Sequence, residues 1–511
     1  MKAFFKNNYI IIIAMISLII SRIPCVFFEL HGINFDEAAI NYNIFCISEF
    51  GTDRYLNPFP VYFANAASGQ SALYVYIGVI FSKIFGFSVT VGRVIKLICE
   101  MVTLFFGGVL VRDIFNKRTE WIFYILYIIS PYFYKMTGMA YDCDMVIPVF
   151  VLAMYLAYNC YKKNTVAGYI GLGVCLGMLS YSYIIAVFMI PLFIVVQLIF
   201  GWNRKYLIIE TAVAFVVSFP IFLYLLTLIE VIPGIYTDYF TIAPVSMYRK
   251  SDFGFSIENL LNLKYMVVTD TQFDFSGSRY FGTIYYISWL LVPAGLIRLI
   301  KEIKTSQEKK CFIGFLIVAF VPLLLIKDAS TYNFTVLYVF LLVLTAYGFD
   351  LLINNFKTFS VIVGIAYVVM TEIFLREYFI REPYMYGDDM IMGALEYVDL
   401  DEKVMLDTTG VNQPECYIGI KYGVNPKDIV YDKYGRGKSV GNIFFDDYEN
   451  YKKYNTVLIR DKLNYEYYMG NGGGLSSYQV RHLIDEFNKL GYTLEIAEGY
   501  YFYSKGESEN E

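Results

Sequence analysis

Long apolar runs separated by short basic clusters dominate the first three-quarters of the chain. A helix needs about 20 apolar residues to cross the hydrocarbon core of a bilayer. The pattern therefore predicts about eleven transmembrane spans and a mainly α-helical, polytopic membrane bundle. The predicted spans are residues 8–28, 88–111, 119–135, 144–161, 166–180, 183–200, 206–229, 281–300, 311–326, 332–353 and 358–376.

Lysine and arginine residues between the runs predict the orientation, because short cytoplasmic loops are enriched in them. Lys2 and Lys6 precede the first run and place the N-terminus in the cytoplasm. With eleven spans, later clusters such as Arg204 with Lys205 also fall on the cytoplasmic side. This count requires residues 72–85, which are apolar but too short for a span, to form an interfacial helix on the outer leaflet.

The last part of the chain is polar and mixed in charge, which indicates a separate soluble domain. We divide the chain into a transmembrane domain, residues 1–376, and a small extracytoplasmic α/β domain, residues 377–511. The second domain should contain short strands and one helix with a 3.6-residue period at 477–490. The predicted strands are residues 404–406, 428–431, 456–459, 492–497 and 500–503.

Composition agrees with this architecture and excludes several classes of protein. Hydrophobic residues make up 57% of the 511 positions and charged residues only 17%, values that exclude an ordinary soluble protein. The eight cysteines form no CxxC pair and only two histidines occur, which argues against a zinc site or a disulfide framework. No P-loop or GxGxxG motif opens a βα unit, and nothing indicates a nucleic acid partner.

Acidic residues occur at two places on the predicted outer face. Asp36 and Glu37 lie in the first long loop, which is longer and more aromatic than a simple connection requires. Asp142 lies just before the fourth span, and Asp144 is the first residue of that span. Converging carboxylates suit general-base catalysis or a divalent cation bound at Asp36, Asp142 and Asp144. Two alternatives stay open: Asp36 and Glu37 as solvated loop acids, and Asp144 as a helix cap.

Basic residues complement these acids on the same side. Arg93, Lys96 and Glu100 share one face of the second predicted span, so they should point into the bundle. We expect Lys96 to pair with Glu100 and leave Arg93 to hold an anion such as phosphate. Lys327, in an outer turn, supplies another cation. The alternatives are a structural ion pair with a snorkelling arginine, and a snorkelling Lys327.

Aromatic and amide side chains in the outer segments suit sugar rings, whose CH faces stack while their hydroxyls need hydrogen-bond partners. Tyr42, Tyr62, Gln70 and Tyr141 are the candidate sugar contacts. Together with the cations and the lipid-accessible helices, they suit a substrate with a lipid tail, a phosphate and a sugar.

Several segments resemble the bacterial glycosyltransferase family 39-like proteins of the GT-C superfamily. They are FDEAAINYN, GTDRYLNPFPVYFANAASGQSALYVY, VGRVIKL and MTGMAYDCDM. This superfamily includes protein O-mannosyltransferases and aminoarabinose transferases. The resemblance implies a GT-C helical bundle in the bacterial plasma membrane, a polyprenyl-phosphate-linked sugar donor and an extracytoplasmic acceptor.

The resemblance also implies roles for individual residues. Asp36 would be the catalytic base, Glu37 would orient the acceptor, and Asp142 matches the second outer acid. Arg93 would contact the donor phosphate, and we add Lys327 and Arg54 as further candidates for this contact. The implied reaction is a single inverting displacement that requires no metal.

Two other functions compete with the transferase. A transporter or flippase of lipid-linked glycans would carry ionisable residues near the bilayer midplane and two repeated halves. The sequence shows only Glu100 near the midplane and no internal repeat. A scaffold that binds glycan without turning it over would depend on the C-terminal domain and tolerate loss of Asp36.

Overall fold

The computed structural model divides the chain into two compact units. The first comprises Met1–Leu30 and Pro60–Glu382, and the second His31–Phe59 and Pro383–Glu511. The structure describes residues 2–28, 32–65, 68–244, 254–262, 280–304, 306–327, 333, 335–380, 389–408, 410–432, 435–447, 450, 453–460, 489, 492–497 and 500–505.

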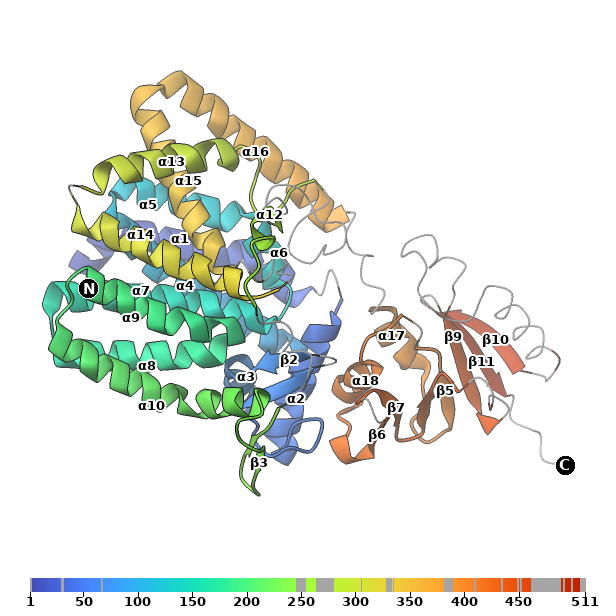
Figure 1. Ribbon diagram of the computed structural model, residues 1–511. Helices are drawn as coiled ribbons and strands as arrows, with labels where there is room; N and C mark the ends of the chain where they lie inside the picture. The colour runs from blue at the N-terminus through green and yellow to red at the C-terminus, as the bar shows by residue number, and fades with distance from the viewer. Residues whose placement is uncertain are drawn as a thin grey trace. The chain divides into compact units, whose positions relative to one another are not determined.

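The first unit is a bundle of helices that run side by side (Figure 1). A helix lies at each of the predicted spans, which confirms the mainly α-helical fold. These helices are α1 (Lys2–Phe27), α4 (Val89–Ile114), α5 (Lys117–Ile129), α7 (Val146–Lys163), α8 (Val166–Ser182), α9 (Met189–Ile199), α10 (Arg204–Leu228), α13 (Ser288–Glu302), α14 (Gln307–Phe320), α15 (Thr335–Asn355) and α16 (Lys357–Ile380).

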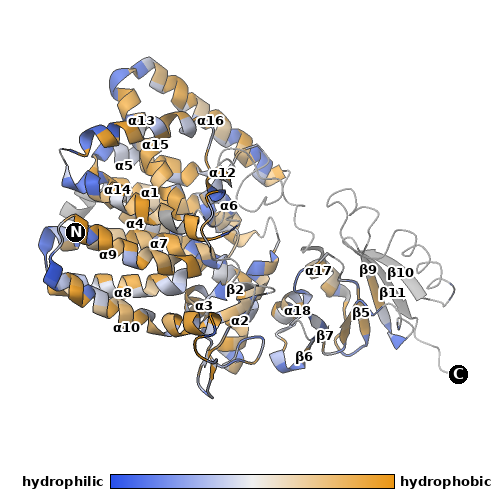
Figure 2. Ribbon diagram, viewed as in Figure 1, coloured by the Kyte–Doolittle hydropathy of each residue, from blue (hydrophilic) through white to orange (hydrophobic). Residues whose placement is uncertain are grey.

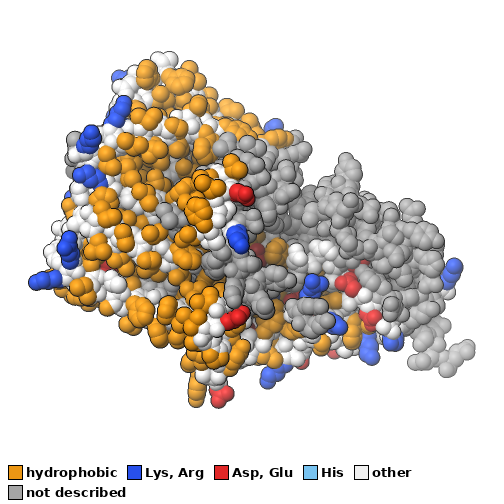
Figure 3. Space-filling model, viewed as in Figure 1, with side chains coloured by type: hydrophobic (Ala, Val, Ile, Leu, Met, Phe, Trp, Pro, Cys, Tyr) orange, Lys and Arg blue, Asp and Glu red, His pale blue; other side chains and the backbone are white. Residues whose placement is uncertain are grey.

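The surface of this bundle is apolar, as a bilayer requires. Within the described part of the chain, six helices are long and apolar enough to cross a membrane. Hydrophobic side chains cover much of the visible face, and hydrophilic residues gather near helix ends (Figures 2 and 3). On α10, for example, Ile208, Phe215 and Val216 are exposed. A soluble monomer rarely exposes so large an apolar surface, so these side chains face lipid.

Two of the predicted spans are interrupted at a proline. The run 119–135 ends as α5 at Ile129, and a separate short helix, α6 (Pro131–Thr137), follows. The run 311–326 ends as α14 at Phe320 and continues as a 3₁₀ turn, η4 (Val321–Leu325), which contains Pro322. Proline lacks the N–H of a helical hydrogen bond, so the prediction of unbroken spans was wrong at both places.

Residues 72–85 form helix α3 (Ala72–Phe85), which confirms the predicted helix. It follows a hairpin of two antiparallel strands, β1 (Tyr62–Asn65) and β2 (Ser68–Ser71), that the sequence did not predict. Ile80, Ile84 and Phe85 are exposed on α3, as an apolar face toward lipid would require. Its position at the membrane interface remains a prediction.

The second unit combines helices with a seven-stranded sheet in the order β10-β11-β9-β5-β8-β7-β6. Strand β5 is parallel to β8 and β9, whereas the other pairs are antiparallel. The strands are β5 (Val404–Leu406), β6 (Ile429–Tyr431), β7 (Gly437–Val440), β8 (Ile443–Phe445), β9 (Thr456–Arg460), β10 (Tyr492–Ala497) and β11 (Tyr500–Lys505). All five predicted strands are present, and the helix predicted at 477–490 lies outside the described residues except for Lys489.

Residues 31–59 group with this second unit, although the sequence analysis placed them in the transmembrane domain. They contain helix α2 (Phe35–Phe50), which packs against helix α18 (Pro414–Tyr422). At the contact a Cβ on Gly419 would lie 2.3 Å from the Tyr42 ring, so only glycine fits there. This contact joins segments far apart in the sequence, which is why the pattern of apolar runs could not reveal it.

Helices α13 and α15 approach so closely that glycine is required on both. A Cβ on Gly295 would lie 2.0 Å from the Leu344 carbonyl oxygen, and one on Gly348 would lie 2.2 Å from the Leu291 carbonyl oxygen. Such small residues let membrane helices pack backbone to backbone.

We expect Gly295→Val to destabilise the bundle by about 2 kcal/mol or more, because the carbonyl it would strike is backbone and cannot move aside. Thermal unfolding of the detergent-solubilised protein measures this loss. Gly171→Val on α8 is the matched control, since a Cβ there meets nothing within 4 Å. Equal melting temperatures for the two variants would contradict the proposed close contact.

Candidate active site

Asp36 and Glu37 lie in the first turn of α2, not in an irregular loop as the sequence analysis expected. Asn34 caps this helix: its side chain accepts a hydrogen bond of 2.9 Å from the Asp36 backbone N–H. Carboxylates in a first turn are stabilised by the helix dipole, which explains why the helix starts here. Asp36 is half-buried and Glu37 is fully buried.

Tyr42 and Arg54 lie inside the second unit, and their roles in sugar and phosphate binding remain predictions. Tyr42 is fully buried and donates a hydrogen bond of 3.0 Å to the Val424 carbonyl. Arg54 is also fully buried, and its guanidinium donates to Cys416 Sγ. Burial raises the pKa of the Cys416 thiol to about 12 despite the neighbouring Arg54, so the thiol stays protonated. Both side chains therefore contribute to the packing of the second unit.

The ionisable face of α4 is the polar centre of the first unit. Arg93, Lys96 and Glu100 all point inward, with 1–2% of each residue exposed, as predicted. The expected Lys96–Glu100 pair is wrong. Lys96 forms its ion pair with Asp144, and Glu100 forms one of 3.1 Å with Arg22 of α1. Because a buried charge needs a close, well-oriented partner, each residue pairs across the bundle instead of along its own helix.

Asp142 and Asp144 lie in a 3₁₀ turn, η1 (Asp142–Met145), immediately before α7. Asp142 Oδ2 accepts a hydrogen bond of 2.6 Å from the Ser71 backbone N–H at the end of the hairpin. Asp144 is held by Lys96 and by the Tyr132 hydroxyl, so it is an ion-pair residue and not a helix cap. A cation at Asp144 would have to displace an ammonium group, so this side chain does not fit a metal site.

The remaining predicted residues occupy different surroundings. Tyr62 of β1 is buried with its ring 4.7 Å from that of Tyr224, and Gln70 of β2 is buried in the same hairpin. Tyr141 is half-buried next to Asp142. Lys327, just after η4, is exposed. The structure therefore brings the hairpin and η1 together at Asp142.

The sequence analysis missed Arg22, which is fully buried in α1. It donates to Glu100 Oε2 and, at 2.9 Å, to the Ile128 carbonyl, and its guanidinium carbon lies 4.7 Å from the centre of the Tyr134 ring. A lone arginine inside an apolar run was the available signal, because such a residue must have a partner in the bundle. Tyr132 and Lys135 of α6 are likewise buried polar residues that no motif marked.

Comparisons with known proteins find one family model and several solved structures that resemble the chain. The model of a family described as dolichyl-phosphate-mannose-protein mannosyltransferase matches residues 70–235, which include the hairpin end, α4 and η1. No curated protein matches the chain at a significant level. Among solved structures, ArnT from Cupriavidus metallidurans bound to undecaprenyl phosphate matches with a TM-score of 0.60 and 11% identity, over 99% of both chains.

Two further structures match. The archaeal oligosaccharyltransferase AglB from Archaeoglobus fulgidus, in complex with an inhibitory peptide and a dolichol-phosphate, has a TM-score of 0.52 and 15% identity over 99% of this chain and 75% of that one. The arabinofuranosyltransferase AftD from Mycobacteria has a TM-score of 0.53 and 10% identity over 99% of this chain and 40% of that one. The chain therefore shares the fold of these three proteins. Its helical bundle and C-terminal α/β region correspond to the fold of ArnT.

We expect Lys96→Met to destabilise the helical bundle by roughly 3–5 kcal/mol, because it leaves the buried Asp144 carboxylate without its ion-pair partner. Thermal or denaturant unfolding in detergent measures this loss. The double variant Lys96→Met with Asp144→Leu should recover at least half of it, since both charges are then gone. Failure of the second substitution to restore stability would mean that the ion pair does not explain the loss.

Proposed function

We propose that this protein is a GT-C glycosyltransferase that moves a sugar from a polyprenyl-phosphate-linked donor to an extracytoplasmic acceptor, with inversion. The observation that carries the proposal is Arg93, a guanidinium buried in an apolar bundle on the same helix face as the Lys96–Asp144 ion pair. A buried arginine is costly in a membrane and suits a phosphate through its bidentate donors. The matched family is named for a dolichyl-phosphate-linked mannose. The similar structures of ArnT and AglB contain undecaprenyl phosphate and a dolichol-phosphate, respectively.

In the proposed mechanism the acceptor oxygen attacks the anomeric carbon of the donor in one displacement. Asp36 takes the acceptor proton as the new carbon–oxygen bond forms, and Glu37 orients the acceptor. The bond from the anomeric carbon to the phosphate oxygen breaks, and its electron pair leaves with the polyprenyl phosphate. Arg93 stabilises the phosphate charge, with Lys327 as a second cation.

Asp142, which accepts a hydrogen bond from the Ser71 backbone N–H, is the second acidic residue of the proposed site. Gln70 and Tyr141 contact the sugar of the donor. The cations stabilise the leaving phosphate, so the proposed reaction requires no metal. The enzyme would lie in the bacterial plasma membrane with its N-terminus in the cytoplasm and its C-terminal domain outside.

The buried charges favour an enzyme over a transporter of lipid-linked glycans. Glu100, the ionisable residue expected near the midplane, is held by Arg22 and by a hydrogen bond from Thr137. A carboxylate fixed in this way stabilises the bundle and is poorly suited to carry an ion across the membrane.

We expect Asp36→Asn to lower the rate of transfer at least about a hundredfold, because the amide cannot accept the acceptor proton. The purified protein in lipid is incubated with a panel of radiolabelled polyprenyl-phosphate sugars, and release of free polyprenyl phosphate is followed. Glu49→Gln, at the exposed end of the same helix, is the matched control and should keep full activity. Full activity of Asp36→Asn would show that Asp36 is not the catalytic base.

We expect Arg93→Gln to raise the KM for the donor about tenfold or more, and Arg93→Lys to restore part of the loss, because lysine keeps the charge without the guanidinium fork. Steady-state kinetics with the donor found in the panel measure both variants. Arg112→Gln, at the other end of α4, is the control and should leave the KM unchanged. If Arg93→Gln and Arg112→Gln behave alike, Arg93 does not hold the donor phosphate.

A further inference from the structure

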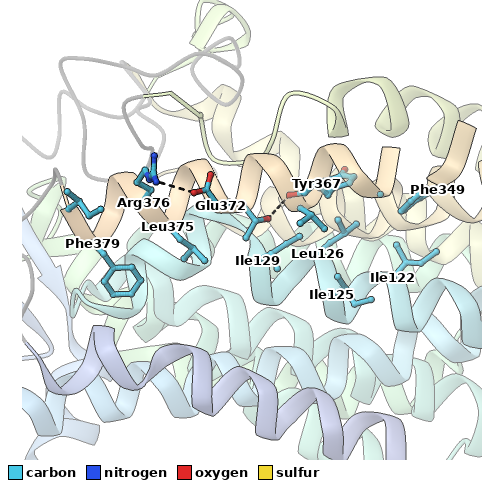
Figure 4. A pocket seen from close by; sticks show the side chains of 14 residues that line it. Ile122, Ile125, Leu126, Ile129, Phe349, Tyr367, Glu372, Leu375, Arg376 and Phe379 are labelled. Atoms are coloured by element: carbon cyan, nitrogen blue, oxygen red, sulfur yellow. Dashed lines mark hydrogen bonds and ion pairs between the residues drawn. The ribbon is translucent and has the colours of Figure 1, made fainter. Parts of the chain in front are cut away.

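An apolar groove of about 810 Å³ lies between α5 and α16 in the transmembrane unit (Figure 4). Ile122, Ile125, Leu126 and Ile129 of α5 form one wall, and α16 supplies most of the other. The groove is open to the surface of the unit, where its wall residue Val368 is 69% exposed. A lipid chain could therefore enter it sideways from the bilayer.

The polar side chains of the groove are arranged asymmetrically. The Tyr367 hydroxyl forms a hydrogen bond of 2.7 Å with Ser288 Oγ, and the Thr371 hydroxyl donates to the Tyr367 carbonyl, so both are satisfied within the protein. The two charged lining residues, Glu372 and Arg376, lie toward one end, near Phe379, whereas Phe349 lies at the other end (Figure 4). A ligand for this groove has a long apolar part and a charged group at one end.

The length of the groove indicates which lipid it fits. From Arg376 its lining residues on α16 run back to Gly364, which is about 18 Å of helix. One leaflet of the hydrocarbon core is only about 15 Å thick. A chain that starts at Arg376 must therefore pass the midplane of the bilayer to reach Gly364 and Phe349, as an isoprenoid chain can.

Arg376 is suited to hold the phosphate of such a lipid. Lys357 belongs to a predicted cytoplasmic cluster, so Arg376, near the opposite end of α16, faces the predicted outer surface. Its guanidinium lies 3.6 Å from Glu372 Oε1, and both side chains are more than half exposed. An exposed pair of this kind contributes little to stability, so the guanidinium can exchange the carboxylate for a phosphate.

The charged end of the groove also lies close to the buried ion pairs of the same unit. Phe374, Tyr378 and Phe379 of α16 pack around Tyr134 of α6. On this same ring lies the guanidinium of Arg22, which pairs with Glu100 on the ionisable face of α4. One layer of side chains thus separates the groove from the buried ion pairs.

We propose that this groove is a second lipid site, which holds the chain of a polyprenyl phosphate with its phosphate on Arg376. It lies apart from Arg93, so its occupant is a carrier that waits to enter or has just left the catalytic site. The choice of a polyprenyl phosphate rests in part on the proposed function, whereas the groove and its charged end do not.

The test uses undecaprenyl phosphate with a photoreactive group in the middle of its chain, bound to the whole protein in phospholipid nanodiscs. Cross-linked peptides should come from α5 and α16. Gly364→Phe should reduce this cross-linking at least tenfold by filling the groove, and it should fold normally because a Cβ there meets nothing within 4 Å. Gly171→Phe, on α8 and equally open, is the matched control and should leave the yield unchanged.

The charged end is tested with the same probe. Arg376→Gln should weaken binding about tenfold, whereas Glu372→Gln should leave it unchanged or tighter. Undiminished cross-linking in Gly364→Phe would overturn the proposal. A second experiment cross-links a photoreactive phospholipid to the groove in the presence of excess undecaprenyl phosphate, and failure of the excess to displace this phospholipid would also overturn the proposal. Cross-linking measures binding and not transfer. A protein that cross-links to the probe but releases no polyprenyl phosphate from any donor would therefore contradict only the proposed function.

Discussion

The burial of charged side chains inside an apolar bundle is the constraint on which the rest of this structure depends. Transfer of a single ion into the low-dielectric interior of a membrane costs several kcal/mol unless another charge compensates it. The first unit meets this constraint with ion pairs that join different segments: Arg22 with Glu100, and Lys96 with Asp144. These pairs fix α1, α4 and η1 to one another, and with them the positions of Arg93 and Asp142.

The second unit is organised in a different way, by close packing. Helix α2 carries the candidate base in its first turn and is held against α18 by contacts that permit little variation. Tyr42 lies over Gly419, the Tyr417 hydroxyl donates to the Ile33 carbonyl at 3.1 Å, and Arg54 is enclosed beside Cys416. The C-terminal domain therefore supports the helix that bears Asp36, and a chain that lacked this domain would lose the packing surface of α2.

The amino-acid sequence predicted the helices well because a bilayer demands long apolar runs, and it predicted five strands from short β-branched and aromatic segments. It failed where partners lie far apart. One other predicted span separates Lys96 from Asp144, so the nearer Glu100 looked like the partner of Lys96. A surface helix is recognised by a polar face opposite an apolar face. Residues 37–44 of α2 are all buried, so the helix has no such pattern and was taken for a loop. The acids Asp36 and Asp142 could be singled out, but the packing roles of Tyr42 and Arg54 could not.

The central claim of this account is that the protein breaks the bond between a sugar and a lipid phosphate instead of moving the intact glycolipid. The most direct measurement follows a donor labelled separately on its sugar and on its polyprenyl chain, supplied to sealed proteoliposomes. The account predicts that the two labels separate and that the lipid label remains as free polyprenyl phosphate. Labels that stay joined and reach the opposite leaflet together would contradict it and indicate a transporter.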